Sequence, residues 1–219
     1  MKQIVLACGV AVLEGDSHLG KWVQEHGRLD CDPAAALAAD FIRPGTSVVD
    51  VGASIGDHTV TYLRRAARVW AFEPNPDAFN CLRHNCPAAK SFNVALGSKP
   101  GLLYWVPVAP NYGASHLSRE PQQGALQVPV WRLDDLKVGL PVSLIKIDVE
   151  GWEIEVLRGA RQTIQRDRPV LLVEVSGHLR RVGASSTELL DLIVGLGYSV
   201  ESALDGPRNE QWDALCSPR

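Results

Sequence analysis

The chain has 219 residues, of which 46% are hydrophobic, and a formal net charge of −3. This length suits one domain with a full core, and the near-neutral charge argues against strong non-specific binding to nucleic acid. No apolar run reaches the roughly 20 residues that span a bilayer. The five cysteines, an odd number without zinc-ligand spacing, fit reduced thiols in a cytoplasmic protein.

The first part of the chain, residues 1–43, precedes any regular alternation of strands and helices. The apolar region ahead of its first cysteine is too short for a signal peptide, so residues 4–13 are predicted to form a strand or core-facing segment. Residues 16–22 and 25–30 carry side chains that transfer protons or bind anions. We expect residues 1–43 to pack as a cap over a site in residues 44–219, with a solvated amphipathic helix as the alternative.

From about residue 46 the sequence alternates between predicted strands and helices, which favours a mostly parallel sheet covered on both faces. The predicted elements up to the middle of the chain are strand 47–51, helix 56–65, strand 68–72, helix 76–84 and strand 91–96. Paired strands at 102–108 and 126–133 then flank a polar loop, 110–124, of a length typical of functional or mobile loops. The remaining elements are strand 142–147, helix 152–165, strand 170–175, helix 186–196, strand 198–203 and strand 211–216.

A glycine turn follows the first predicted strand. Gly52 and Gly56 permit tight backbone geometry, and the following helix offers unpaired N–H groups to an anion. The pattern D-x-G-A-x-x-G lacks the three-glycine fingerprint of a dinucleotide site. Glu73 ends the second strand 21 residues after Gly52, close to the spacing of a ribose-binding acid, although it could instead cap a helix. Asn93 could contact an adenine or serve as a turn residue.

A second strand–glycine–helix segment at residues 144–153 ends its strand in two acids. Asp148 falls at the carboxyl edge, where ligands bind in such sheets, and is the first candidate for general base or substrate-positioning group. Glu150 is the second candidate, unless it only caps the next helix. Both acids could hold Mg²⁺ or Mn²⁺ together with Glu174, but we expect no metal.

These segments together resemble the FkbM family of class I S-adenosylmethionine-dependent methyltransferases. The matching stretches span roughly residues 45–180 in the right order, and Ile-Asp-Val-Glu-Gly followed by Val-Leu-Arg-Gly-Ala is specific to that family. The resemblance implies a Rossmann-like α/β fold, with a mostly parallel seven-stranded sheet, an antiparallel last strand and helices on both faces.

The resemblance also implies S-adenosylmethionine (SAM) as cofactor and assigns roles to individual residues. The cofactor's methionine part would be lined by Asp50, Gly52, Ala53 and Gly56, with Asp57 and His58 close by. Glu73 would hold the ribose, Asn93 would lie near the adenine, and Asp148 would face the sulfonium. Because family members are often O-methyltransferases of sugars, polyketides or other small hydroxylated compounds, we expect a small hydroxylated acceptor. Nothing in the sequence indicates an oligomeric state.

Histidines and aromatic residues offer further candidates for the site. His116, in the polar loop, could reach over the methyl group and is our histidine candidate for catalysis. His178 follows a strand to the same edge, His18 and His26 belong to the predicted cap, and His84 is expected on a helix surface. Three aromatic residues could form an apolar wall for the substrate: Trp22, Tyr112 and Trp152. The alternative is that they pack in the core.

Three other functions are weighed against the methyltransferase. An NAD-dependent oxidoreductase would share the glycine turn and the acidic strand end. This sequence, however, lacks the glycine spacing that such an enzyme requires, and an oxidoreductase would have no role for Asp148 and Glu150. A non-catalytic cofactor-binding protein is disfavoured by the intact turn and acids. A methyltransferase acting on nucleic acid would need a basic groove or an Asn-Pro-Pro-Tyr-type motif, and the sequence has neither.

Overall fold

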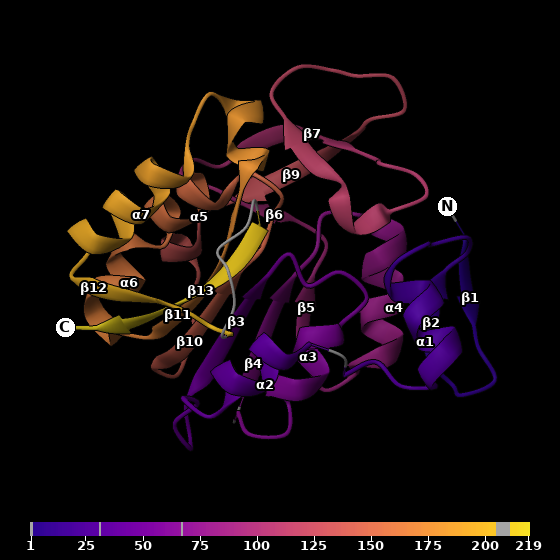
Figure 1. Cartoon of the computed structure of the whole chain (residues 1–219), viewed down its shortest axis with the longest axis horizontal. Coiled ribbons are helices and arrows are strands. Elements are labelled where there is room, and N and C mark those ends of the chain that lie inside the picture. The colour runs from indigo at the N-terminus through magenta and orange to yellow at the C-terminus, as the bar shows by residue number, and fades with distance from the viewer. Residues whose placement is uncertain (1, 31, 67, 205–210) are drawn as a thin grey trace.

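A central sheet of seven strands forms the middle layer of the protein (Figure 1). The computed structural model describes residues 2–30, 32–66, 68–204 and 211–219. Across the sheet the strands run in the order β12 (Tyr198–Ser202), β13 (Gln211–Pro218), β11 (Val170–Ser176), β10 (Val142–Ile147), β3 (Ser47–Val51), β4 (Arg68–Phe72) and β5 (Lys90–Phe92). Strand β13 pairs antiparallel with both neighbours, and every other pair in this sheet is parallel. The arrangement confirms the predicted Rossmann-like α/β fold with an antiparallel last strand.

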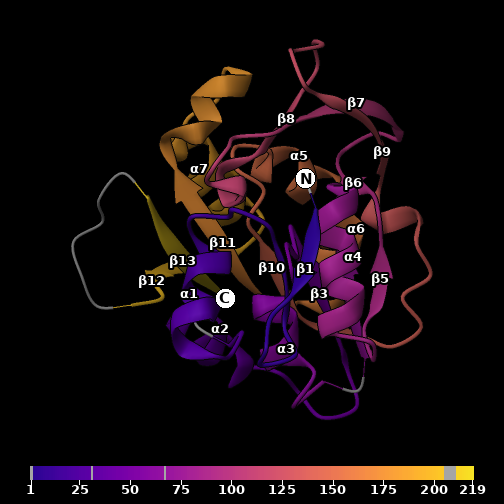
Figure 2. The ribbon, with the colours of Figure 1, turned by 90° about the vertical axis from the view of Figure 1, so that its right-hand side faces the viewer.

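Helices cover both faces of this sheet (Figures 1 and 2). One face carries α5 (Glu153–Gly159), α6 (Arg161–Asp167) and α7 (Ser186–Gly195), and the other carries α2 (Pro33–Ala39), α3 (Asp57–Tyr62) and α4 (Pro76–Asn85). Within β3, Val49 and Val51 pack toward the first group of helices, whereas Val48 packs with α2 and α3. Because both faces are covered, the central strands appear in the sequence as continuous apolar runs.

A smaller sheet lies beside the main one, with strands in the order β6 (Ala95–Leu96), β9 (Leu126–Trp131), β7 (Gly101–Val106) and β8 (His116–Ser118). The predicted pairing of the strands now seen as β7 and β9 is confirmed, and they are antiparallel. The prediction of one strand over residues 91–96 is wrong, because β5 ends in the main sheet and β6 joins the smaller sheet. Between them the Asn93 amide donates hydrogen bonds to the carbonyl oxygens of Glu73 and Pro74, 2.8 and 3.0 Å away, so the chain turns there. Strand β8 lies within the predicted loop.

Two predicted helices differ in length from the observed ones. The helix predicted over 152–165 is two helices, which meet at Ala160 with a non-helical φ of −105° and ψ of 3°. At Gly159 an added Cβ would lie 2.0 Å from the Gly97 carbonyl oxygen, so the end of α5 packs directly against that backbone. The helix predicted over 56–65 is shorter at both ends: Gly56, with a left-handed φ of 100°, is the N-cap of α3, and Leu63 is its C-cap.

The N-terminal residues form a hairpin and two helices. Strands β1 (Gln3–Val5) and β2 (Ala11–Leu13) pair antiparallel, and α1 (Leu19–His26) follows. The Asn85 amide of α4 ties the hairpin to the main domain by donating to the carbonyl oxygens of Ala11 and Ile55 at 2.9 and 2.8 Å. Helix α2, in contrast, packs against α3 and the sheet itself.

The composition predicts reduced thiols and no membrane span. Cys8, Cys81, Cys86 and Cys216 are free thiols, whereas Cys31 lies outside the described residues. Within the described ranges, no helix is both long and apolar enough to cross a membrane.

Candidate active site

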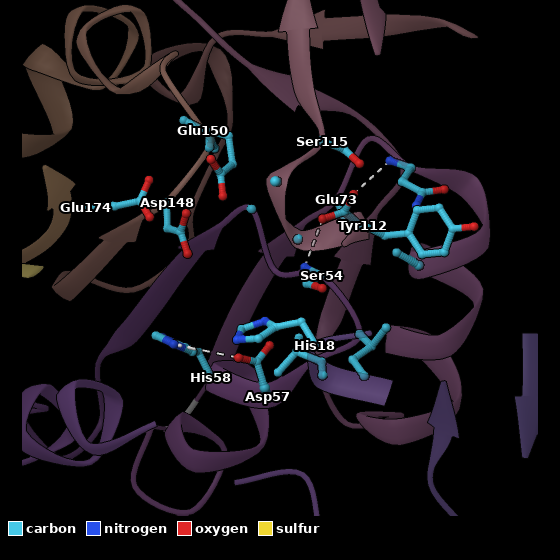
Figure 3. A pocket seen from close by; sticks show the side chains of 18 of the residues that line it. His18, Ser54, Asp57, His58, Glu73, Tyr112, Ser115, Asp148, Glu150 and Glu174 are labelled. Carbon is cyan, nitrogen blue, oxygen red and sulfur yellow. Dashed lines mark hydrogen bonds and ion pairs between the residues drawn. The ribbon is translucent and has the colours of Figure 1, made fainter. Parts of the chain in front are cut away.

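The carboxyl ends of β3, β4, β10 and β11 open onto a pocket of about 830 Å³ (Figure 3). This is the edge at which ligands bind in parallel α/β sheets. The predicted site residues that line the pocket are Gly52, Asp57, His58, Glu73, His116, Asp148 and Glu150. The predicted cofactor residues that are not part of its lining are Asp50, Ala53, Gly56 and Asn93.

The glycine turn after β3 is fixed by close packing. Gly52 has a left-handed φ of 78°, and the N–H groups of Gly52 and Ala53 both donate to the Phe72 carbonyl oxygen at 3.0 Å. An added Cβ at Gly52 would lie 1.8 Å from the Asp148 carbonyl oxygen, and one at Gly56 would lie 2.8 Å from Cys86 Sγ. Gly52 therefore lets the ends of β3 and β10 approach each other, and Gly56 lets the start of α3 approach the end of α4.

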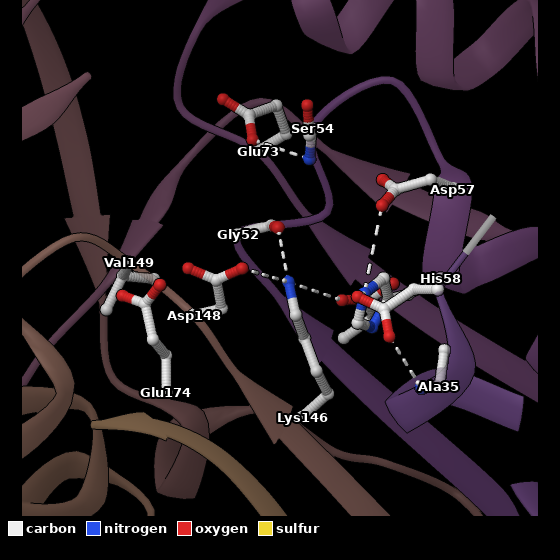
Figure 4. Close-up of polar contacts among 12 residues, drawn as sticks. Ala35, Gly52, Ser54, Asp57, His58, Glu73, Lys146, Asp148, Val149 and Glu174 are labelled. Atoms are coloured by element: carbon white, nitrogen blue, oxygen red, sulfur yellow. Dashed lines mark hydrogen bonds and ion pairs between the residues drawn. The ribbon is translucent and has the colours of Figure 1, made fainter. Parts of the chain in front are cut away.

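Glu73, at the end of β4, organises the turn that it faces. Its carboxylate accepts hydrogen bonds from the backbone N–H groups of Ser54 and Asn75, each at 2.8 Å (Figures 3 and 4). The side chain is buried, and this burial raises the pKa of Glu73 to about 7 although both N–H groups oppose the shift. Ser54 itself has a left-handed φ of 47°. Asn93 anchors the backbone of Glu73 from behind, instead of lining the pocket.

A buried lysine, Lys146 of β10, connects the strand ends beneath the pocket (Figure 4). Its Nζ donates to the Gly52 carbonyl oxygen at 2.7 Å and lies 3.6 Å from both Asp50 Oδ1 and Asp148 Oδ2. Burial disfavours the charged amine, but the charges of Asp148 and Asp50 outweigh it and raise the pKa of Lys146. Asp50 also accepts a hydrogen bond from Thr59 Oγ1 at 2.6 Å. Asp50 therefore orients the lysine, and the lysine orients Asp148.

His58, in the first turn of α3, links the pocket to the N-terminal residues. Its Nε2 lies 3.0 Å from Asp32 Oδ2 and 3.7 Å from Asp57 Oδ2. Burial opposes the charge on His58, yet the hydrogen bond that His58 donates to Asp32 and the charge of Asp57 raise the pKa of His58. For Asp32, burial is likewise outweighed by His58, and its pKa falls to about 2. Asp32 also caps α2 by accepting from the Ala34 N–H at 2.7 Å.

Acidic side chains and a histidine gather where β10 and β11 end. Glu150 has a left-handed φ of 57°, and its carboxylate contacts the His178 imidazole. Burial and the charge of Asp148 raise the pKa of Glu150 to about 8 and that of Glu174 to about 10. Glu153, and not Glu150, holds the turn before α5, since it accepts from the N–H groups of residues 149 and 151 at 3.3 and 2.9 Å.

The opposite side of the pocket comes from the polar loop and the N-terminal residues. His116 begins β8, and its buried Nδ1 has no hydrogen-bond partner of acceptable geometry in residues 2–30, 32–66, 68–204 and 211–219. Burial and the charge of Arg181 lower the pKa of His116, so its ring is neutral near pH 7. The loop touches the N-terminal residues through a hydrogen bond from the Ser17 N–H to the Pro110 carbonyl oxygen at 3.0 Å. The other side chains that line this side include His18, Lys21, Trp22, Glu25 and Tyr112.

The remaining histidine and tryptophan candidates lie outside the pocket lining. His26 stacks on Trp22, with ring centroids 4.3 Å apart, and His84 on α4 contacts the Gly9 carbonyl oxygen at 3.0 Å. Trp152 packs in the core, which was the alternative to a place in the apolar wall for the substrate. Conversely, four pocket residues were not predicted from the sequence: Asp32, Lys146, Gln211 and Asp213. A lysine inside an apolar strand was a visible signal for Lys146.

Comparison with known proteins places these features in one family. The sequence profile of the Methyltransferase FkbM domain matches residues 50–200. The chain is 35% identical over 126 residues to the hexuronic acid methyltransferase AglP of Haloferax volcanii, a match covering 53% of this chain and 50% of that protein. It is 26% identical over 197 residues to the 2-O-methyltransferase NoeI of Sinorhizobium fredii, covering 79% of each. The first match therefore spans only half of the relative's length.

Solved structures share the fold at low sequence identity. The methyltransferase FkbM of Methylobacillus flagellatus superposes with a TM-score of 0.54 at 20% identity, covering 91% of this chain and 57% of that one. A putative methyltransferase of Streptococcus mutans, solved in complex with SAH, gives a TM-score of 0.52 at 11% identity and covers 84% of this chain and 94% of its own. At these identities the likeness concerns the fold alone.

Proposed function

The chain belongs to the FkbM methyltransferase family, and we propose that it transfers the methyl group of SAM to a hydroxyl group of a sugar or similar small molecule. The observation that carries this proposal is the convergence of Glu73, Asp148 and His116, from three separate parts of the chain, on one pocket at the carboxyl edge of the sheet. A ribose-binding acid, a strand-end carboxylate and a neutral histidine are the groups that such a transfer requires.

The residues around the glycine turn suit the cofactor. Each oxygen of the Glu73 carboxylate accepts one backbone N–H and retains a second lone pair. The carboxylate can therefore also accept hydrogen bonds from two ribose hydroxyls. Gly52 and Ser54 would contact the methionine part, and Asp57 lies at the start of α3 beside them. The S. mutans neighbour, which shares the fold, was solved with SAH, the demethylated form of SAM.

The chemistry requires alignment and a proton acceptor. When bound, SAM supplies an activated methyl group with a good leaving group. The protein must hold the acceptor hydroxyl in line with that methyl, which can lower the barrier by several kcal/mol. In this proposal Asp148, whose carboxylate lies 3.6 Å from Lys146 Nζ, holds the hydroxyl. His116 lines the pocket and, with its lowered pKa, is neutral near pH 7, so it can take the proton.

The acceptor is proposed from the pocket mouth and the relatives. Trp22 and Tyr112 offer aromatic rings beside the polar side chains of Asp16, Lys21 and Glu25, a combination that suits a sugar with apolar faces and hydroxyl edges. The names of the two curated relatives point to a hexuronic acid and to a 2-O position. In this proposal residues 16–25 act as a cap that selects the acceptor.

The proposal can be tested with isotopically methyl-labelled SAM. Purified protein is incubated with hexoses, hexuronic acids and their glycosides, with an RNA and a DNA duplex in parallel, and products are identified by mass spectrometry. We expect label on a sugar oxygen. Transfer to nucleic acid alone, or to none of these acceptors, would reject the proposed function.

The role of His116 has its own test. His116→Gln should lower kcat by roughly 10²–10⁴-fold, the usual contribution of a general base. In the wild-type enzyme, kcat/KM should decline only as the pH falls below about 6.5, because the base must be unprotonated and its pKa is lowered. The matched control is His84→Gln, an exposed histidine outside the pocket, which should keep its activity. Full activity of the His116 variant would remove this residue from the mechanism.

A further inference from the structure

Three side chains on the acidic side of the pocket are arranged like the ligands of a metal ion. Glu150, Glu174 and His178 each offer one ligand atom, and these atoms all lie within 4.8 Å of one another. Ligand distances of about 2.0–2.3 Å, usual for divalent transition metals, allow one ion to contact all three. The sequence had suggested Asp148 in place of His178.

Glu174 provides an independent indication of a ligand. The residue is only 5% exposed. Its Oε1 accepts a hydrogen bond from Gln211 Nε2, but its buried Oε2 has no hydrogen-bond partner among the residues that the structure describes. A buried carboxylate oxygen normally has a partner, because leaving it without one is energetically costly. Glu174 lines the pocket and lies close to Asp148 and Glu150 (Figure 3).

Glu150 and His178 meet each other without a proper hydrogen bond. Glu150 Oε2 and His178 Nδ1 are in contact, yet within the described part of the chain neither atom has a hydrogen-bond partner of acceptable geometry. Arg181 Nη1 lies 4.0 Å from the same Glu150 oxygen, which is too far for a hydrogen bond. A cation bound by both the carboxylate and the imidazole would satisfy both atoms.

The backbone holds this arrangement in place. Glu150 has a φ of 57°, which is unfavourable for a residue with a side chain. Gly151 follows with a φ of 109°, and an added Cβ there would lie 2.6 Å from the His178 carbonyl oxygen. The turn after β10 is thus pressed against the segment after β11, which fixes the spacing between Glu150 and His178. Strained backbone of this kind is common where function demands a particular geometry.

We propose that Glu150, Glu174 and His178 bind one divalent cation, and that Mn²⁺ is the best match to two carboxylates and one imidazole. All three ligands line the pocket, so the remaining coordination positions face the acceptor. The next consequence rests on the proposed methyl transfer. In that reaction the cation holds an acceptor with two neighbouring oxygens, such as a vicinal diol or a hydroxy acid. It would also ease loss of the proton from the hydroxyl that is methylated.

The cation site can be tested without activity. The protein is treated with EDTA, desalted and titrated with Mn²⁺, while electron paramagnetic resonance measures the free ion. We expect one bound equivalent in the wild type. Glu174→Gln and His178→Ala should each weaken binding at least about 100-fold, since even residues that only support ligands cost 10–100-fold. The matched control is Asp213→Asn, which removes a pocket carboxylate outside the three-residue cluster and should weaken binding by less than about fivefold.

The same samples are titrated with SAH, and unchanged affinity in the ligand variants shows that they are folded. His178 is partly exposed, so its variant serves if Glu174→Gln fails to fold. Three results would overturn the cation site: no saturable Mn²⁺ binding to the wild type, unchanged binding in the Glu174 and His178 variants, or an equal loss in the Asp213 variant. Mn²⁺ binding without SAH binding would uphold the cation site and reject the methyltransferase proposal, so the two failures are distinguishable.

Discussion

The buried carboxylate of Glu73 makes the stability of this protein depend on pH in a way that one substitution can isolate. Burial raises its pKa to about 7, against an ordinary value of 4.5, and the N–H groups of Asn75 and Ser54 only partly oppose this. Between these pH values the folded chain keeps a proton that the unfolded chain has lost, so the free energy of unfolding falls as the pH rises. Since each pH unit of difference corresponds to about 1.4 kcal/mol, the loss reaches about 3 kcal/mol above pH 7.

Glu73→Gln removes this titration while keeping the shape of the side chain and one acceptor oxygen. The free energy of unfolding of the variant, relative to that of the wild type, should therefore rise by roughly 2–3 kcal/mol from pH 5 to pH 8. Urea denaturation at both pH values measures it. The matched control is Glu201→Gln, an exposed carboxylate on β12, for which the difference should stay level.

The same variant separates stability from ligand binding. If Glu73 holds the ribose hydroxyls, Glu73→Gln should weaken SAH binding by about 10–100-fold, because a hydrogen bond to a charged group is worth about 1.5–3 kcal/mol. A stability difference that does not change with pH would refute the buried, ionisable Glu73. Equal SAH affinity would refute its role toward the ribose.

Three further predictions concern the glycine turn, the strand-end acid and the buried ion pair. Gly52→Ala should destabilise the fold by more than about 4 kcal/mol in thermal unfolding, because its Cβ would meet the Asp148 carbonyl oxygen at 1.8 Å. The matched control is Gly45→Ala, because Gly45 has nearly the same φ and no atom lies within 4 Å of an added Cβ. This variant should lose only about 1–2 kcal/mol of stability. Equal losses of stability in the two variants would contradict the clash at Gly52. Asp148→Asn should lower kcat at least about 100-fold, measured by steady-state kinetics, and leave the SAH affinity unchanged, measured by calorimetry. Equal turnover of the variant and the wild type would exclude a catalytic role for Asp148. Asp32→Asn should cost about 2 kcal/mol at pH 7, since a pKa of about 2 against 3.8 stabilises the fold above pH 3.8. In urea denaturation this cost should shrink as the pH falls toward 2, and a cost independent of pH would argue against the ion pair with His58.

Much of the fold was predictable because strands buried on both faces appear as continuous apolar runs. The observed bounds of β3, β4 and β10 equal the predicted ones. The division at Asn93 was not predictable, because β6 pairs with residues 130 and 131 of a strand that comes much later in the chain. The break between α5 and α6 falls beside the contact of Gly159 with Gly97, a tertiary contact that no local pattern encodes.

The candidate site was predictable where a residue directly follows a strand. Glu73 and Asp148 lie at the carboxyl edge for this reason. Asp213 comes from the antiparallel β13, and its position beside the pocket depends on the strand order. Asp32 reaches His58 from the N-terminal residues across a tertiary contact. Such partners carry no signal in the spacing of the sequence.

The most direct test of the central claim is calorimetric titration of the purified chain with SAM, SAH and NAD. We expect one site with micromolar affinity for SAM and SAH and no detectable binding of NAD, whose pyrophosphate would need the glycine spacing that this turn lacks. Binding of NAD alone, or of none of the three, would contradict the assignment of this pocket to a methyl donor.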